Sequence, residues 1–243
     1  MDPIVHQVAQ CGIDSALPLD AVLAGDGFNV RNEKRSDCKN WPARYAIKVN
    51  RALADRLVAL AAHDLATRAR LAEDGSLFGG YNPKMRAVHE SNARQLDTII
   101  GASGWPTAQE VGDDGAEAAW LIAQHAIGLP DFQRKCFALL QAEVAAGQAP
   151  SWQMAMMCDR IRIYEGRLQL YGTQFDWDDE GQMSPRPSED PDGVDRRRGE
   201  VGLEPLADAI VRHKAQSASQ PKPTDLAERR KQMDDWAKSV GWR

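Results

Sequence analysis

The sequence predicts a mainly α-helical fold, a compact bundle-like domain that carries one small β-hairpin. Apolar residues recur at helical spacing over most of residues 42–159, with breaks at glycine and proline. Residues 160–174 change to the apolar/polar alternation that is typical of strands. The chain has 243 residues, of which 43% are hydrophobic, so it can bury a sizeable core.

The chain divides into three parts. Residues 1–40 carry several glycines and a charged run without a sustained period, and they predict an irregular N-terminal arm. Residues 41–215 form the helical domain. Residues 216–243 read as a linker and a charged C-terminal helix, which we expect to be a solvated or partner-docking appendage.

Five helices are expected before the hairpin. Leu53, Leu57, Leu60 and Ala61 place an apolar stripe on the first, and Gly128 and Gly147 are suited to end the third and fourth. The short connection before Pro130 implies antiparallel neighbours. The expected ranges are 42–73, 84–100, 114–127, 130–146 and 151–159.

The hairpin is expected at residues 160–174. Ile161 and Ile163 alternate with polar residues, Glu165 and Gly166 make the turn, and a second alternating run follows. Its aliphatic face should lie on the helices, because a two-stranded hairpin alone is marginally stable. After it comes an acidic, turn-rich stretch, residues 175–195, which we expect to act as a lid, and a short helix at 203–214.

Charge and hydropathy exclude several classes of function. The formal net charge of −5 removes the long-range attraction to phosphate backbones, so we expect no general nucleic-acid binding. No apolar run approaches the roughly 20 residues that span a bilayer, and the N-terminus lacks the pattern of a signal peptide. We therefore expect a cytoplasmic protein. The four cysteines form no CxxC pair and are expected to pack as small hydrophobes.

The candidate site is a set of polar residues at the ends of the predicted elements. The sequence contains no P-loop, GxGxxG, GxSxG or HExxH motif. Burying several unpaired polar groups is costly, so these residues must form a satisfied network or line a wet cleft beside the hairpin. The members are His125, Gln133, Asp159, Arg160, Tyr171 and Gln174, with Arg198 following the acidic stretch.

Each member of the set has an expected catalytic or binding role. His125 or Asp159 would move a proton, and Arg160 and Arg198 would hold a carboxylate or phosphate. Gln133, Tyr171 and Gln174 would bind and orient the substrate. The structural alternative stays open, in which Gln133 ties two helices together and Asp159 and Arg160 make charge-assisted bonds at a junction.

No metal ligand is assigned from the sequence, and the cofactor is unknown. His63, His89, Glu90 and His125 are the histidine and acidic residues we considered. Their spacing matches no strong ligand signature, and histidine ligands need a convergence in space that a sequence does not display.

An ordered set of motifs resembles a family of bacterial proteins catalogued as a domain of unknown function. The resemblance covers about residues 53–213, implies a common domain and supplies no established reaction. The chain departs from the family pattern at Asp64 and Leu65, where the family often has an acidic residue followed by glutamine. The motifs are GWP at 104–106, AAWLIAQHA at 118–126, PDFQRKC at 130–136, CDR at 158–160, QLYGTQF at 169–175 and PSEDPDGVDRRRGEVGL at 187–203.

Two classes of function follow. The first is a small-molecule enzyme, a hydrolase or transferase that acts on a polar, anionic substrate. The second is a non-catalytic binding or interaction module, in which the polar network fixes the fold and the C-terminal tail docks a protein partner. A pocket that holds His125 near Arg160 and Gln174 would favour the enzyme.

Overall fold

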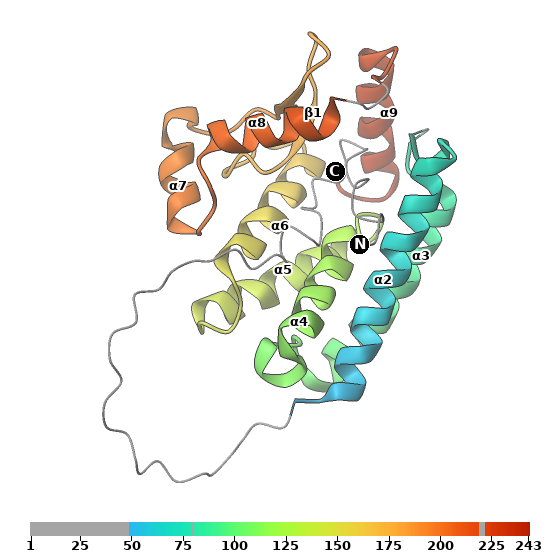
Figure 1. Ribbon diagram of the computed structural model, residues 1–243, viewed down its shortest axis with the longest axis vertical. Helices are drawn as coiled ribbons and strands as arrows, with labels where there is room; N and C mark the ends of the chain where they lie inside the picture. Colours follow the sequence, from blue (N-terminus) through green and yellow to red (C-terminus); the bar gives the residue numbers. More distant parts are fainter. Residues whose placement is uncertain (1–48, 79, 219–221) are drawn as a thin grey trace, which may run out of the picture.

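A computed structural model of the chain describes residues 49–78, 80–218 and 222–243, and this part is mainly α-helical, as predicted (Figure 1). The predicted arm at residues 1–40 lies outside the described residues. The helices are α2 (Arg51–Glu73), α3 (Pro83–Ser103), α4 (Ala108–His125), α5 (Pro130–Ala145), α6 (Ser151–Tyr164), α7 (Val194–Glu200), α8 (Leu206–Ser217) and α9 (Leu226–Ser239). The strands are β1 (Phe175–Trp177) and β2 (Met183–Pro185), and two 3-10 turns cover Ser76–Phe78 and Pro191–Gly193.

Helices α2, α3 and α4 form the part of the bundle that positions the site. The Asn50 side chain accepts a hydrogen bond from the Leu53 amide and so caps α2. Gly115 lets α4 approach α2 closely, because a Cβ there would lie 3.2 Å from the Cα of Ala54 and less than 3.0 Å from the Val111 side chain. The facing residues Leu57 and Ala119 are fully buried between the helices. Side chains nearer the C-terminal end of α2, such as Asp64, therefore reach the C-terminal end of α4.

The hairpin is present, but it lies at residues 175–185 and the predicted location at 160–174 is wrong. Helix α6 continues to Tyr164, and Gly166 follows it with a φ of 75°. The alternation of isoleucine with arginine fits a strand, which explains the wrong prediction. Met157, Ile161 and Tyr164 also share one helix face and are all buried, and this wider spacing fits the observed helix. Residues 167–174 form an irregular segment, which contains an isolated β-bridge between Gln169 and Ser188.

The acidic stretch contains regular structure, and its expected role as a lid stays a prediction. Its first half is the antiparallel pair of β1 and β2, in which Phe175 lies opposite Pro185 and Trp177 opposite Met183. Phe175, Trp177 and Met183 form a second small core with Ala209 of α8. This ribbon and α8 lie together at one end of the molecule, with α7 beside them (Figure 1).

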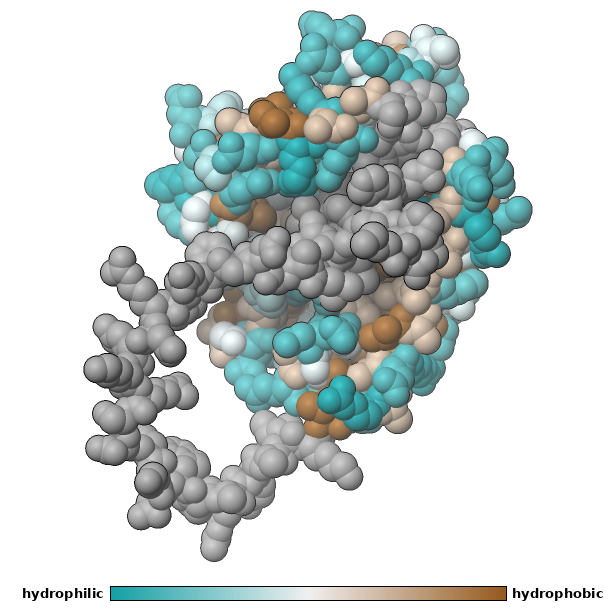
Figure 2. Space-filling view, viewed as in Figure 1, coloured by the Kyte–Doolittle hydropathy of each residue, from teal (hydrophilic) through white to brown (hydrophobic). Residues whose placement is uncertain are grey.

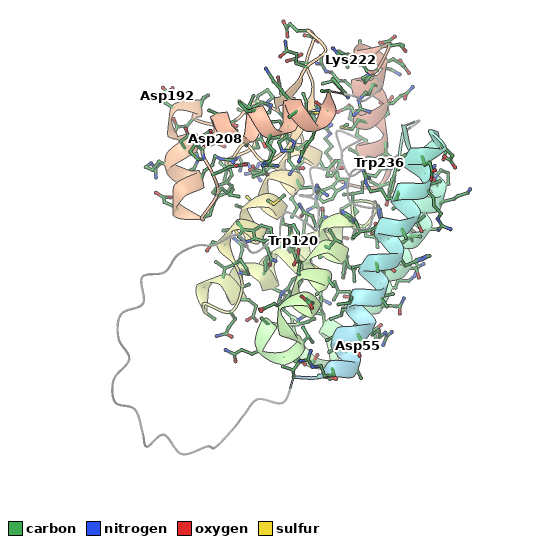
Figure 3. All side chains as sticks on the ribbon, in the orientation of Figure 1. Asp55, Trp120, Asp192, Asp208, Lys222 and Trp236 are labelled. Atoms are coloured by element: carbon green, nitrogen blue, oxygen red, sulfur yellow. The ribbon has the colours of Figure 1, made fainter. Side chains whose placement is uncertain are left out.

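The C-terminal segment packs on the main core, so the expectation of a solvated appendage is wrong. Ala237 and Trp242 are buried within the main cluster, and Trp236 and Met233 pack against it. The Trp242 indole donates to the carbonyl of Ile127 at 2.8 Å, which satisfies an acceptor just beyond the end of α4. Trp236 of α9 packs edge-on against Tyr81, just before α3, whereas Trp120 of α4 packs edge-on against Trp152 of α6 (both tryptophans are labelled in Figure 3).

The part of the described surface that Figure 2 shows is mostly polar. Hydrophilic side chains predominate over α7, α8 and the outer side of α2, and the hydrophobic residues form small separate patches (Figure 2). Large exposed hydrophobic side chains are confined to Val58, Leu168 and Val211 among the described residues. No helix in the described ranges is long and apolar enough to cross a membrane.

His213 makes the packing of α8 sensitive to acid. Its ring stacks on Phe175 with centroids 3.8 Å apart, and burial, with nearby Arg212 and Arg198, lowers the pKa of His213 from 6.5 to about 3. As the pH falls, His213 therefore gains its proton at a higher pH in the unfolded chain than in the folded protein. The free energy of unfolding decreases as the pH falls from about 6.5 towards 3.

We expect His213→Phe to remove part of this acid sensitivity. The variant keeps a ring against Phe175 but does not titrate. Between pH 7 and pH 4 it should lose about 3 kcal/mol less stability than the parent protein. Urea unfolding at the two pH values measures the difference. An equal loss in both proteins would contradict the assignment.

Candidate functional site

Three titratable side chains from three helices converge in the bundle. Asp64 of α2, His89 of α3 and His125 of α4 form what we call the Asp-His-His cluster. The Asp64 Oδ2 lies 3.1 Å from the His125 Nδ1 and 3.4 Å from the His89 Nε2. The three residues are 1%, 4% and 2% exposed. One buried carboxylate oxygen therefore faces two imidazoles.

Asp64 and His89 occupy positions on the buried faces of their helices. Asp64 occupies the buried stripe of α2, four residues before Arg68 and three after Ala61, which are both buried. His89 lies on the same face of α3 as the buried Met85, four residues earlier. Polar residues thus occupy positions whose neighbours on the same face are core residues.

Tyr81 orients His89 from the side opposite Asp64. The Tyr81 hydroxyl lies 2.8 Å from the His89 Nδ1, and the two rings stack with centroids 5.7 Å apart. Tyr81 also meets Trp236 of α9 edge-on. The ring of His89 is therefore held by a hydrogen bond and by aromatic packing, and its Nε2 faces the Asp64 carboxylate.

Asp64 remains a carboxylate at neutral pH. Burial alone would raise its pKa, but His125, followed by His89, outweighs burial, and the pKa of Asp64 falls well below its usual range. A carboxylate with a depressed pKa stabilises the fold above its unfolded pKa of about 4, and that contribution is lost as the pH falls through the folded pKa.

The cluster has unused bonding capacity. Among the described residues, the Asp64 Oδ1 and the His125 Nε2 are buried without a hydrogen-bond partner, whereas the His89 Nε2 faces the Asp64 Oδ2 at 3.4 Å. Both polar atoms of the Gln124 side chain, in the residue before His125, are also unpartnered within the described ranges. Buried polar atoms of this kind are uncommon in folded proteins, and a bound ion, a water molecule or a substrate is the usual kind of explanation.

Asp159, predicted as catalytic, anchors the segment that follows α6. It is 0% exposed and accepts hydrogen bonds from the amides of Leu170, Tyr171 and Thr173 and from the Thr173 hydroxyl, at 2.6 to 3.1 Å. Burial is the larger influence and raises the pKa of Asp159 against these bonds. Gly172, with a φ of 65°, allows the segment to turn around the carboxylate.

Arg160, Gln133 and Gln174 lie in one buried network, as the sequence predicts. Arg160 donates to the Gln124 carbonyl at 2.9 Å and to the Gln174 side-chain oxygen at 3.3 Å. Gln133 donates to the carbonyls of Ala123 and Gln124, which joins α5 to the end of α4. The network therefore reaches the residue next to His125.

Arg198 and Tyr171 lie at the far side of this network. Arg198 donates to the carbonyls of Glu204 and Tyr171, and its guanidinium holds the 167–174 segment against α7. The Tyr171 backbone amide is bonded to Asp159, and its side chain is partly exposed. Roles of these residues in binding a substrate stay predictions.

Sequence reasoning identified His125 but did not assign a role to Asp64, His89 or Tyr81. The available signal was a polar residue on the buried stripe of an amphipathic helix, found at Asp64 and again at His89. Two of the other residues considered for a metal are elsewhere: His63 is exposed, and Glu90 pairs with Arg86 and Arg94.

A cavity of about 300 Å³ lies apart from the cluster, beside the end of β2 and against α9. Four arginines line it, Arg167, Arg186, Arg230 and Arg243, and Asp234 is the acidic residue in its wall. None of the predicted site residues lines this cavity. The predicted cleft around His125 stays a prediction.

A comparison with family models identifies the domain. A model described as a family of unknown function, DUF6624, matches residues 51–217. The chain belongs to this family. The DUF6624 match runs from the start of α2 to the end of α8 and contains all three residues of the Asp-His-His cluster. No curated protein and no solved structure matches the chain.

Proposed function

We propose that this DUF6624 protein is a cytoplasmic small-molecule enzyme, a hydrolase or transferase, with its reaction centre at the Asp-His-His cluster. The observation that supports the proposal is a buried carboxylate shared by two imidazoles, one of which, His125, has a buried Nε2 with no hydrogen-bond partner among the described residues. A buried imidazole nitrogen without a partner calls for an explanation, and a reaction centre that keeps the atom for its substrate provides one.

The chemistry is activation of a nucleophile. In the structure Asp64 accepts from the Nδ1 side of His125, which fixes the tautomer and leaves the Nε2 lone pair to take a proton from water or a substrate hydroxyl. The same carboxylate stabilises the positive charge that the imidazole then gains. His89 presents a second nitrogen to the same carboxylate oxygen.

An anionic substrate fits the charge beside the cluster. Arg68 follows Asp64 by one helical turn on the same face of α2 and is 4% exposed. A buried guanidinium one helical turn from the cluster suits carboxylate or phosphate groups. The proposal therefore keeps the expected class of substrate, with Arg68 as the recognising charge in place of Arg160 and Arg198.

A screen of the full chain tests the proposal. Purified protein is assayed for hydrolysis of phosphate esters, carboxylate esters and amides, beside His125→Asn and the matched control His63→Gln, an exposed histidine of α2. We expect turnover with the parent and the control and its loss with His125→Asn. Turnover that survives His125→Asn would place the reaction centre elsewhere.

A second candidate function is a non-catalytic module that binds an anionic ligand, and the arginine-lined cavity favours it. Four guanidinium groups against one lining carboxylate give this cavity a positive wall in a chain whose net charge is −5. Much of that charge is already paired, for example Arg230 with Asp179 and Arg167 with Glu165. Binding here would be modest and would weaken with salt.

We expect Arg230→Gln to weaken phosphate binding by about tenfold if this cavity is the ligand site. Titration calorimetry with inorganic phosphate measures the affinity, and Arg196→Gln, an exposed arginine of α7 outside the cavity, is the control. Equal phosphate affinity in parent, variant and control would remove the cavity from consideration.

A further inference from the structure

The geometry points to a divalent metal site at the Asp-His-His cluster. We infer that Asp64, His89 and His125 each supply one ligand atom to a first-row transition-metal ion. One candidate ligand atom from each residue lies within 4.8 Å of the other two. The inference deepens the proposed function by naming the cofactor class of the same centre, and metal binding itself is measurable without any substrate.

The two separations from Asp64 are also compatible with a shared ion. Charge-assisted hydrogen bonds between an imidazole and a carboxylate are about 2.7–2.9 Å long. The two observed separations are longer, 3.1 Å to His125 and 3.4 Å to His89. Two ligands of a tetrahedral ion with bonds of about 2.0–2.1 Å lie roughly 3.3 Å apart. Both separations are close to that spacing.

The surroundings supply the support that metal ligands need. The Tyr81 hydroxyl bonds the Nδ1 of His89 at 2.8 Å and so leaves the Nε2 to face the ion. Each ligand comes from a different packed helix, α2, α3 or α4, which holds the three donors rigidly. Burial of all three residues excludes bulk water, which would compete for the ion.

The donor set selects the class of metal. Two imidazoles and one carboxylate suit zinc, iron, cobalt or nickel, whereas magnesium and calcium prefer oxygen ligands alone. Three protein ligands leave at least one position for water or substrate, the arrangement of catalytic sites. With the ion bound, His125 is a ligand, and the ion supplies the activation of water that the proposed function requires.

The test is metal loading of the full-length protein after removal of metals with a chelator. Zn²⁺ is titrated by calorimetry, and Co²⁺ is titrated by its visible absorption, whose intensity reports tetrahedral coordination. We expect one equivalent per chain and a higher Tm in the presence of Zn²⁺. Asp64→Asn and His89→Gln should abolish stoichiometric binding, and Glu90→Gln, next to His89 on the surface of α3, should leave it unchanged.

Tyr81→Phe keeps the test decisive where a cluster variant fails to fold. It removes one hydroxyl and retains the ring stacked on His89, and we expect it to weaken Zn²⁺ binding by about 10- to 100-fold. Absence of stoichiometric binding in the parent, or unchanged affinity in the folded variants, would overturn the metal site. Stoichiometric Zn²⁺ binding without turnover would support the metal site and contradict the proposed enzyme activity. Turnover by the metal-free protein would support the enzyme activity and contradict a catalytic metal.

Discussion

Replacement of His125 by asparagine is expected to lower turnover by about 10²- to 10⁴-fold, the range that one positioned proton-transfer group contributes. The asparagine amide nitrogen takes the place of the Nδ1, which lies 3.1 Å from Asp64, so the buried carboxylate keeps a donor. The Nε2 is lost, and the amide neither accepts a proton nor coordinates a metal as an imidazole does. Steady-state kinetics on the best substrate of the screen measures the effect.

Two observations keep this result interpretable. Circular dichroism and urea unfolding establish that His125→Asn is folded, because a 2% exposed residue of α4 also contributes to packing. His63→Gln, which changes an exposed histidine next to Asp64 in the sequence, should retain full turnover. A folded His125→Asn variant with turnover within threefold of the parent would refute the proposed centre.

Asp159→Asn is expected to produce the largest loss of stability, about 3 kcal/mol. The carboxylate accepts from three backbone amides and the Thr173 hydroxyl, and an asparagine turns an NH₂ group towards some of these donors. Each buried donor left unpaired costs about 1–3 kcal/mol. Burial of a charged carboxylate is costly, as the raised pKa of Asp159 indicates, and the uncharged asparagine avoids this cost, which offsets part of the loss. Urea unfolding at pH 7 measures the change.

The matched control is Asp192→Asn, an exposed aspartate near the start of α7 (Figure 3). It should change the free energy of unfolding by less than about 0.5 kcal/mol. The same Asp159→Asn protein also tests the catalytic role predicted from the sequence. If it retains turnover at a temperature where it is folded, Asp159 is structural, and a loss of turnover in the folded protein would return it to the reaction centre.

Local periodicity accounts for most of what the sequence predicted about the fold. The helices that became α3 and α5 begin and end close to the expected residues, because proline, glycine and the apolar stripe act within a few turns. The hairpin was placed wrongly because a four-residue alternation such as RIRI fits a strand, while the wider spacing of Met157, Ile161 and Tyr164 fits a helix. The longer pattern prevailed because all three pack into the core.

The sequence by itself determined that this protein is mainly helical, and it singled out His125 and a set of other polar residues as candidates for a site. Only the tertiary structure decided which of them meet. Asp64 and His125 are 61 positions apart and His89 lies on a third helix, so their convergence depends on how α2, α3 and α4 pack. Helix packing is set by side-chain contacts across the whole bundle, which no local spacing encodes.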